Sequence, residues 1–404
     1  MTVNYKIEGD SLIIALEGHL NGENADCVKE DVLKIIEEHP DAKVVFDAQH
    51  LNYISSMGLR VLLTIQKMKQ EQQGKIEVRE VGRGIFDVFR MTGFTKLMDV
   101  MPKLHEISVE GKEIVGQGQS STVYRINNEF IVKLYNKLLP LEKIRQEIDF
   151  ARKAFVAGVP TAITFNLVKC GNNYGAVFEM VDHADTVGHT LTAHPEKFDE
   201  IMQKFVATYK VIHQADIKEK GGFTSIKDTW TKWAGGMERT GAFTTKESDM
   251  LRDMIAAVPE RSTMVHCDYH AGNVMYQNGE IIVIDMADIG YGHPIFDLAG
   301  GAFHARYCYF PKRQKVHGMS EADMLRFWDT LIRMYFNCPD QKRVEEIKET
   351  LSAFGLLRGA VFPMKHVQIA PETKAFHVEE TRKQLFPRMQ WAMEQVSKLE
   401  ELFG

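Results

Sequence analysis

The pattern of strand and helix signals changes once along the chain, near residues 101–111, and this change constrains the fold more than any other feature. Before it, short apolar runs alternate with longer segments in which apolar residues recur at helical spacing. Strands are predicted over residues 3–10, 11–18, 42–48 and 75–82, and helices over residues 21–40, 55–74 and 84–94. Because strands that alternate with helices form a helix-covered sheet, we expect an α/β domain over residues 1–103.

A different pattern follows the change. Residues 105–137 contain three strand-like runs connected by Gly-rich and Asn-Asn turns, which predicts an antiparallel meander. A helix is predicted over residues 141–160, and from about residue 184 the pattern is mostly helical, except around residues 265–292. The 404 residues exceed what one hydrophobic core usually supports, so we expect more than one domain.

Composition excludes several classes of protein. Hydrophobic residues make up 44% of the chain, charged residues 26%, and the formal net charge is -6. These values are typical of a globular protein and lack the basic excess of a nucleic-acid-binding domain. The start, MTVNYKIEGD, has no signal-peptide pattern, no apolar stretch reaches bilayer length, and the five Cys form no CxxC pair. We expect a cytoplasmic protein with no nucleic-acid partner and no membrane insertion.

Acids follow apolar runs at two places, in VHCDYHAGNVM (265–275) and IIVIDMADIGYG (281–292). Buried apolar runs usually avoid acids, so this arrangement indicates a bound cation and a proton acceptor. Phosphoryl transfer needs both, together with a phosphate cradle and an anchoring cation. We predict that Asp268 accepts the proton of a substrate hydroxyl, and that Asn273 and Asp285 bind Mg²⁺. His266 is interpreted as a packing residue that holds the loop.

Candidates for the cradle and the anchoring cation precede these motifs. Gly116 and Gly118 lie between two predicted strands, where glycine permits close approach to phosphates and positive φ, although any hairpin can contain this pair. Lys133 lies in the apolar strand FIVKLY and needs a partner or solvent. ATP phosphates would serve, with Glu147 or, as second choice, Glu142 as its ion partner. The alternative is an edge-strand lysine that faces water.

Two other types of site fit the sequence less well. His266 and His270 have the spacing of a zinc-binding HExxH helix, but Cys267 replaces the Glu and Gly272 follows where a helix should continue. Protein kinases carry Arg before the catalytic Asp and a long activation segment that ends in Ala-Pro-Glu. Cys267 occupies the Arg position, and the segment 285–297 is too short for an activation loop. A small-molecule acceptor is therefore favoured.

These residues resemble the aminoglycoside phosphotransferase and choline kinase family, from about Gly116 to Ala299, through HCDYHAGNVM and IDMADIGYGHPIFDLA. The resemblance implies a bilobal, α+β protein-kinase-like fold that uses ATP and Mg²⁺, with an N-lobe over 104–181 and a mostly helical C-lobe over 182–404. It implies that backbone groups of Glu179 and Val181 face adenine and that Asp297 supports the catalytic loop. The chain departs from the family where Ser121 and Cys267 replace glycines.

The segment DAQHLNYISSMGLRVLL (47–63) places two serines at the start of a predicted helix. Either serine would serve as an N-cap, and a phosphoserine there would meet free amides and the positive end of the helix dipole. The segment resembles a STAS domain, the fold of anti-sigma-factor antagonists, over residues 1–103. The family's phosphoacceptor precedes the Gly of Gly-Leu by two residues, which corresponds to Ser56; Ser55 replaces the usual acid.

Two functions follow from the combined resemblance. The first is an ATP- and Mg²⁺-dependent phosphotransferase that acts on a hydroxyl of a small molecule, with a STAS domain that contacts a regulatory protein partner. The second is a partner-switching regulator in which the kinase-like domain senses nucleotide or phosphorylates Ser56. The base and metal set favours catalysis, while the fused STAS domain favours regulation.

Overall fold

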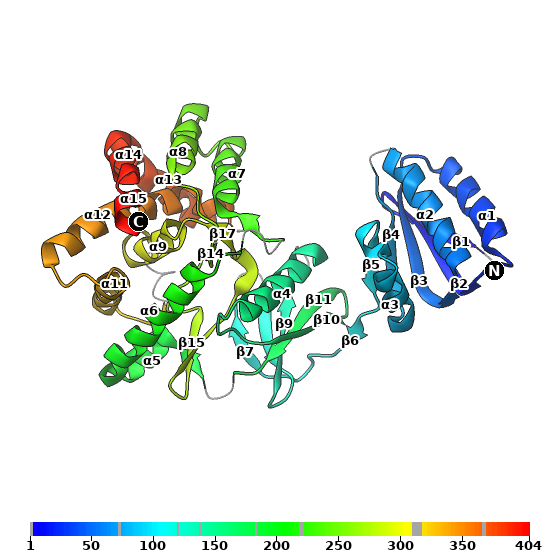
Figure 1. Cartoon of the computed structure of the whole chain (residues 1–404), viewed down its shortest axis with the longest axis horizontal. Coiled ribbons are helices and arrows are strands. Elements are labelled where there is room, and N and C mark those ends of the chain that lie inside the picture. The colour runs from blue at the N-terminus through cyan, green and yellow to red at the C-terminus, as the bar shows by residue number, and fades with distance from the viewer. Residues whose placement is uncertain are drawn as a thin grey trace. The chain divides into compact units, whose positions relative to one another are not determined.

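The computed structural model describes residues 3–71, 74–118, 121–136, 139–181, 184–217, 222–308, 317–365 and 369–404. The chain forms two compact units, Met1–Ile107 and Ser108–Gly404 (Figure 1). Among the described residues, no helix combines the length and the apolar character needed to cross a bilayer.

The first unit is an α/β domain, as predicted. Its elements are β1 (Asn4–Glu8), β2 (Ser11–Leu20), α1 (Ala25–Glu38), β3 (Lys43–Ile54), α2 (Ser56–Glu71), β4 (Glu77–Val81), α3 (Arg83–Met91), η1 (Phe94–Lys96), β5 (Asp99–Pro102) and β6 (His105–Glu106). Five strands form one sheet in the order β1-β2-β3-β4-β5, in which β1 and β2 are antiparallel and the other neighbours are parallel. The apolar faces of α1, α2 and α3 are buried in its core.

Strand β5 was not predicted. Its four residues are too short to show alternation and end in Pro102, yet they pair with β4. Strand β3 also extends beyond the predicted segment 42–48 to Ile54, with shifts of register against β2. This extension carries the chain directly into the first turn of α2, where the two serines lie.

The second unit begins with the predicted meander. Its first elements are β7 (Ile114–Gln117), β8 (Ser121–Arg125), β9 (Phe130–Tyr135), α4 (Leu141–Val156), β10 (Thr164–Cys170) and β11 (Asn173–Glu179). The strands are antiparallel in the order β10-β11-β9-β8-β7. Because β9 is central, Lys133 lies inside this sheet and not at its edge, so the edge-strand alternative is wrong.

The rest of the second unit is mostly helical, as predicted. Its helices are α5 (Val187–Ala193), η2 (Pro195–Lys197), α6 (Phe198–Gln214), α7 (Ile226–Arg239), α8 (Thr245–Ala257), η3 (Met286–Asp288), α9 (Ile295–Ala302), the π-helix η4 (Phe303–Tyr307), α11 (Glu321–Tyr335), α12 (Gln341–Val361), η5 (Phe362–Met364), α13 (Pro371–Gln384), η6 (Phe386–Arg388), α14 (Met389–Ser397) and α15 (Leu399–Phe403). Its strands are β12 (Asp185–Thr186), β13 (Thr224–Ser225), β14 (Thr263–Val265), β15 (Val274–Gln277), β16 (Glu280–Val283) and β17 (Gly290–Gly292).

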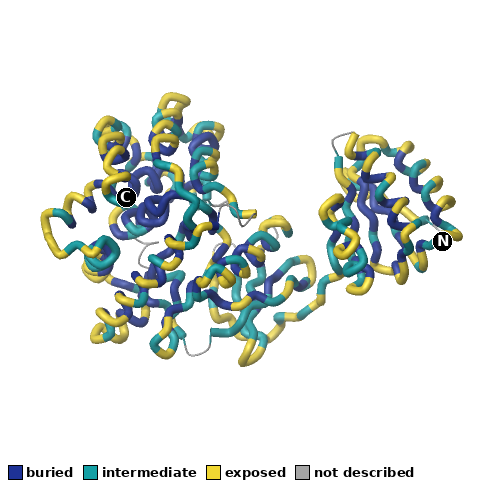
Figure 2. The backbone as a smooth tube through the Cα atoms, in the orientation of Figure 1, coloured by how far each residue is buried: buried dark blue, intermediate teal, exposed yellow. Residues whose placement is uncertain are grey.

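Two small sheets, β12-β15-β16 and β13-β17-β14, hold the segment that contains both acidic motifs. Helix α9 packs extensively on α12, and both are largely buried in the large core of this unit (Figure 2). The loop between β14 and β15 is therefore anchored at both ends by strands and backed by a rigid helical core.

Candidate active site

Asp268 lies in the loop between β14 and β15, where Asn273 fixes its position. The Asn273 Nδ2 donates to the Asp268 backbone oxygen at 3.1 Å and to its Oδ2 at 3.3 Å. The Asn273 Oδ1 is buried and has no hydrogen-bond partner within the described part of the chain. A buried amide oxygen without a donor is a ready ligand for a hard cation.

Asp297, in the first turn of α9, holds the start of this loop. Its Oδ2 accepts the His266 N–H at 2.9 Å and contacts the His213 Nε2 at 3.0 Å. The His266 Nδ1 in turn accepts the Asp268 N–H at 3.3 Å. Burial lowers the pKa of His266, so the ring stays neutral, as an accepting Nδ1 requires. His213 was missed from the sequence, because it lies on α6, remote from both motifs.

Lys133 connects the small sheet to the second acidic motif. Its Nζ lies 2.6 Å from Glu147 Oε1 on α4 and 2.8 Å from Asp285 Oδ1. Burial disfavours the charge of Lys133, but the two carboxylates outweigh it and raise the pKa of Lys133 well above its usual value. Lys133 also holds the pKa of Asp285 below its usual value. Glu142, the second choice for an ion partner, is exposed at the start of α4.

The predicted nucleotide-binding backbone is only partly defined. Gly116 lies in β7 opposite Val123, and the Gly118 N–H donates to Ser121 O at 2.9 Å. Neither glycine has a positive φ, so the expectation of a left-handed backbone at these positions is wrong. Residues 119–120 lie outside the described residues. The Glu179 N–H donates to Ile163 O at 2.9 Å. Val181 is half-buried just after β11.

Lys365 was missed from the sequence, although it makes the shortest contact with the predicted base. Its Nζ lies 2.8 Å from Asp268 Oδ2 and 2.8 Å from Asp288 Oδ2. Burial opposes ionisation of Asp268, but Lys365 and the nearby His270 reverse this effect and hold the pKa of Asp268 well below its usual range. Residues 357–370 are mostly apolar, and no motif in the sequence marks this lysine.

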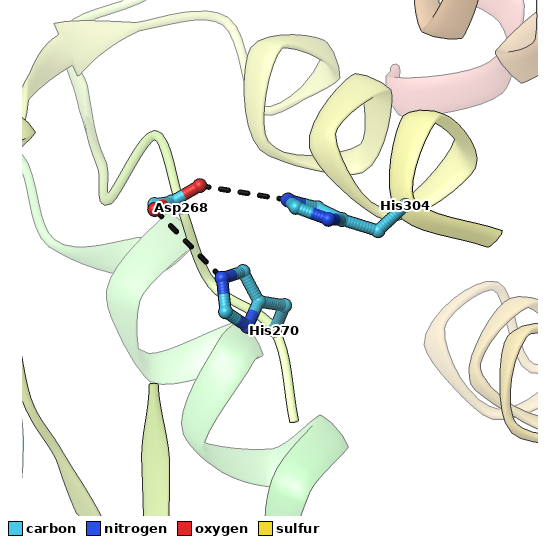
Figure 3. Close-up of side chains that lie close together, drawn as sticks. All are labelled: Asp268, His270 and His304. Atoms are coloured by element: carbon cyan, nitrogen blue, oxygen red, sulfur yellow. Dashed lines mark ion pairs between the residues drawn. The ribbon is translucent and has the colours of Figure 1, made fainter. Parts of the chain in front are cut away.

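Two histidines face Asp268 (Figure 3). The His270 Nε2 lies 3.7 Å from Asp268 Oδ2, and the His304 Nε2, on η4, lies 3.6 Å from Oδ1. Their spacing would suit a metal ion. However, the His270 Nδ1 accepts the Gly272 N–H at 3.1 Å, so the ring carries a proton on the Nε2 that faces the carboxylate.

In this arrangement the His270 Nε2 is a hydrogen-bond donor and not a metal ligand. His266, the other histidine of the HExxH-like spacing, accepts the Asp268 N–H at its Nδ1, and its backbone N–H donates to Asp297.

The two serines of the first unit have different environments. The Ser55 Oγ accepts the Gly58 N–H at 3.3 Å, so Ser55 is the N-cap of α2. Ser56 is the first residue of the helix and is exposed. A Cβ on Gly58 would lie 2.7 Å from Leu20 O, so glycine is required for α2 to pack against β2. Ser56 is therefore the more exposed of the two serines.

Family models match both units. The model of the STAS domain matches residues 2–107, and the model described as the phosphotransferase enzyme family (APH) matches residues 113–315, about half of the chain. The chain belongs to the phosphotransferase enzyme family. It carries a STAS domain at its N-terminus, so both family expectations from the sequence are confirmed.

Known proteins are similar to the STAS domain or to the phosphotransferase domain of this family member. The anti-sigma factor antagonist BtrV of Bordetella bronchiseptica is 34% identical over 95 residues, which cover 24% of this chain and 80% of BtrV. The ADP-bound aminoglycoside phosphotransferase APH(2'')-Ib is 14% identical with a TM-score of 0.46, over 69% of this chain and 93% of that chain. A choline/ethanolamine kinase family protein from Mesorhizobium loti is 15% identical with a TM-score of 0.46, over 72% and 92%.

This family member keeps a left-handed backbone where it lacks the expected glycine. Cys267 has a φ of 58°, a conformation that favours glycine, and its side chain is buried in the helical core. Asp285 has a φ of 63°. Such conformations cost non-glycine residues about 1–2 kcal/mol each and persist when the surrounding structure enforces them. Both strained residues adjoin the predicted chemistry.

Proposed function

We propose that this chain is an ATP- and Mg²⁺-dependent phosphotransferase that acts on a hydroxyl of a small molecule, and that the STAS domain regulates it through a protein partner. One observation carries the proposal. A half-buried lysine on β9 that is paired with two acids lies in the same compact unit as a carboxylate base and an amide with an unused oxygen in the β14–β15 loop. These are the parts that phosphoryl transfer requires.

The donor set suits Mg²⁺. The Asp285 carboxylate and the Asn273 Oδ1 are hard oxygen ligands, and the latter has no donor within the described residues. When bound, Mg²⁺ supplies positive charge beside the β- and γ-phosphates. The Lys133 Nζ lies 2.8 Å from Asp285, where it would hold phosphate oxygens, and Glu147 orients this ammonium group.

Asp268 is proposed as the proton acceptor. Its depressed pKa keeps it ionised at neutral pH, and Asn273, His270 and Lys365 fix its orientation. Because Lys365 stabilises the ionised carboxylate, Asp268 serves best by orienting the hydroxyl and receiving its proton late in the transfer. A small acceptor is favoured, because only a short segment separates Asp285 from α9 and leaves no platform for a peptide.

The substitution Asp268→Asn tests the proposal. Loss of the base should lower acceptor-dependent ADP formation by about two to four orders of magnitude and leave nucleotide affinity nearly unchanged. The exposed Asp253→Asn on α8 is the matched control and should keep full activity. Equal rates in the wild type and Asp268→Asn, with a metabolite pool as acceptor, would remove the catalytic role.

A second function is favoured by the exposure of Ser56 and by the names of the STAS relatives, which are called anti-sigma factor antagonists. In this proposal the chain is a partner-switching regulator and Ser56 carries the phosphate. The wild type and the Asp268→Asn variant are each treated with ATP, and site-resolved mass spectrometry of Ser56 tests this second proposal. Label that persists in the variant assigns the transfer to a separate kinase, and a rate independent of protein concentration assigns it to transfer within one molecule.

A further inference from the structure

The two oxygens of the Asp268 carboxylate face different groups. Oδ2 lies beside Asn273, at 3.3 Å, and Lys365, at 2.8 Å, which is the side of the predicted metal ligands. Oδ1 lies 3.6 Å from the His304 Nε2 and 3.9 Å from the Arg358 Nη2. Arg358 therefore adjoins the face of the base that none of the predicted metal or nucleotide residues contacts within the described chain.

Arg358 is a buried cation that lacks a hydrogen-bonded anion. Its side chain is 2% exposed, and its Nη1 is buried with no hydrogen-bond partner in the described part of the chain. Its ion-pair contact there, with Asp268, is longer than a hydrogen bond. The rings of Trp230, Trp233 and Phe362 lie 5.4–5.6 Å from the guanidinium, within the range of cation–π contacts, which supply no hydrogen-bond acceptor. A buried charge without a close partner is costly by several kcal/mol, so this fork of donors is suited to an anionic ligand.

The neighbouring charges leave Arg358 available. Lys365 bridges Asp268 and Asp288 with two short contacts, so the acids already have a closer cation. His304 is neutral, because burial lowers its pKa to about 3. Arg358 is thus a positive charge beside Asp268 whose Nη1 has no hydrogen-bond partner among the described residues.

We propose that Arg358 binds a carboxylate or phosphate group of the acceptor, so that the substrate is an anionic alcohol: a hydroxy acid or a phosphorylated alcohol. This inference rests on the proposed phosphotransferase function. The acceptor hydroxyl would attack the γ-phosphorus, a new O–P bond would form as the bond to the β–γ bridging oxygen breaks, ADP would leave, and Asp268 would take the proton. A cationic amino sugar or choline would be repelled by the same guanidinium.

The inference also separates the two proposed functions. The residues around Ser56, NYISSMGLR (52–60), contain no acid and end in an arginine. This segment offers Arg358 no partner, so the site favours a small anionic acceptor over Ser56.

Binding by the full-length protein tests the inference without requiring turnover. Inorganic phosphate and glycerate are titrated by calorimetry at constant ionic strength, with tryptophan fluorescence as a second signal, because Trp230 and Trp233 lie 5.6 Å from the guanidinium. Arg358→Gln should weaken binding about 10- to 100-fold, as expected for the loss of charge-assisted hydrogen bonds. Arg358→Lys, which keeps the charge and is the safer variant for folding, should show an intermediate loss. The control Arg326→Gln removes an exposed arginine and should bind as the wild type does.

A turnover experiment then distinguishes the inference from the proposed function. ADP formation is followed with glycerate, glycerol phosphate, glycerol and choline. Preference for the anionic acceptors, with a raised KM for them in Arg358→Gln, supports the inference. A raised KM for ATP instead would assign the guanidinium to the γ-phosphate and overturn it.

Two further outcomes are decisive. Turnover of glycerol or choline in preference to the anions would overturn the inference and leave the phosphotransferase standing. If wild type and Arg358→Gln bind both anions equally, or neither binds them, the inference fails whatever the turnover shows. Absence of ADP formation with every acceptor, the metabolite pool included, would count against the proposed function alone, because the binding experiment decides the anion site separately.

Discussion

Lys365→Met removes the buried ammonium that lies against the predicted base. Its Nζ is 2.8 Å from each of two carboxylates, and at an effective dielectric near 20 each contact corresponds to about 6 kcal/mol before desolvation. Burial of the ammonium offsets most of this attraction. Removing one partner of a buried ion pair typically costs about 3–5 kcal/mol, so we expect a loss of that size in the free energy of unfolding near neutral pH.

The sign of the pH dependence follows from the pKa of Asp268. In the wild type that pKa is depressed, so the stability it contributes is present above the unfolded value of about 4 and is lost as the pH falls through the lower folded value. In Lys365→Met the largest cation effect is removed, so we expect burial to outweigh the remaining contacts with His270 and His304 and to raise the folded pKa above the unfolded one. Protonation then relieves the buried charge, so the penalty should be largest near neutral pH and should shrink as the pH falls toward 5.

Urea unfolding followed by Trp fluorescence measures this penalty. The four Trp residues, at positions 230, 233, 328 and 391, all lie in the unit Ser108–Gly404, so the signal reports that unit. Lys232→Met makes the same chemical change at an exposed position of α7 and is the matched control. Equal losses in the two variants, or a penalty in Lys365→Met that does not decrease between about pH 7.5 and pH 5, would refute the reasoning.

Three further predictions address other parts of the chain. Asp285→Ala should weaken nucleotide binding in the presence of Mg²⁺ and have little effect in EDTA, which calorimetry measures; a wild type without Mg²⁺ dependence would contradict the metal assignment. Gly58→Ala should destabilise the first unit by about 1–3 kcal/mol, because its Cβ would lie 2.7 Å from a backbone oxygen, whereas Gly84→Ala meets open space; hydrogen exchange of the α2 amides compares the two. Ser55→Ala should lower the stability of α2 by about 0.5–2 kcal/mol through loss of its cap, while Ser56→Ala should leave it nearly unchanged and abolish any phosphorylation of the STAS domain.

The sequence by itself determined the features that depend on short stretches of chain. Alternating patterns predicted the α/β unit and the meander, because side-chain periodicity follows directly from the geometry of strands and helices. Asp268 and Asn273 lie five residues apart in one loop, so their proximity could be expected before any fold was known. The short strand β5 was missed for the same reason, since four residues that end in Pro102 carry too little periodic signal.

Only the tertiary structure decided which charges are buried and what they meet. Arg358 lies in the last turn of α12, and Lys365 follows the short helix η5. Both lie in a mostly apolar stretch of sequence, yet the packed structure brings both cations to Asp268. Likewise, only the structure shows that Ser55 caps α2, whereas the preference for Ser56 as phosphoacceptor came from its place before Gly58 in the sequence. Burial and the pairing of charges arise from contacts between segments far apart in sequence, and no local pattern contains that information.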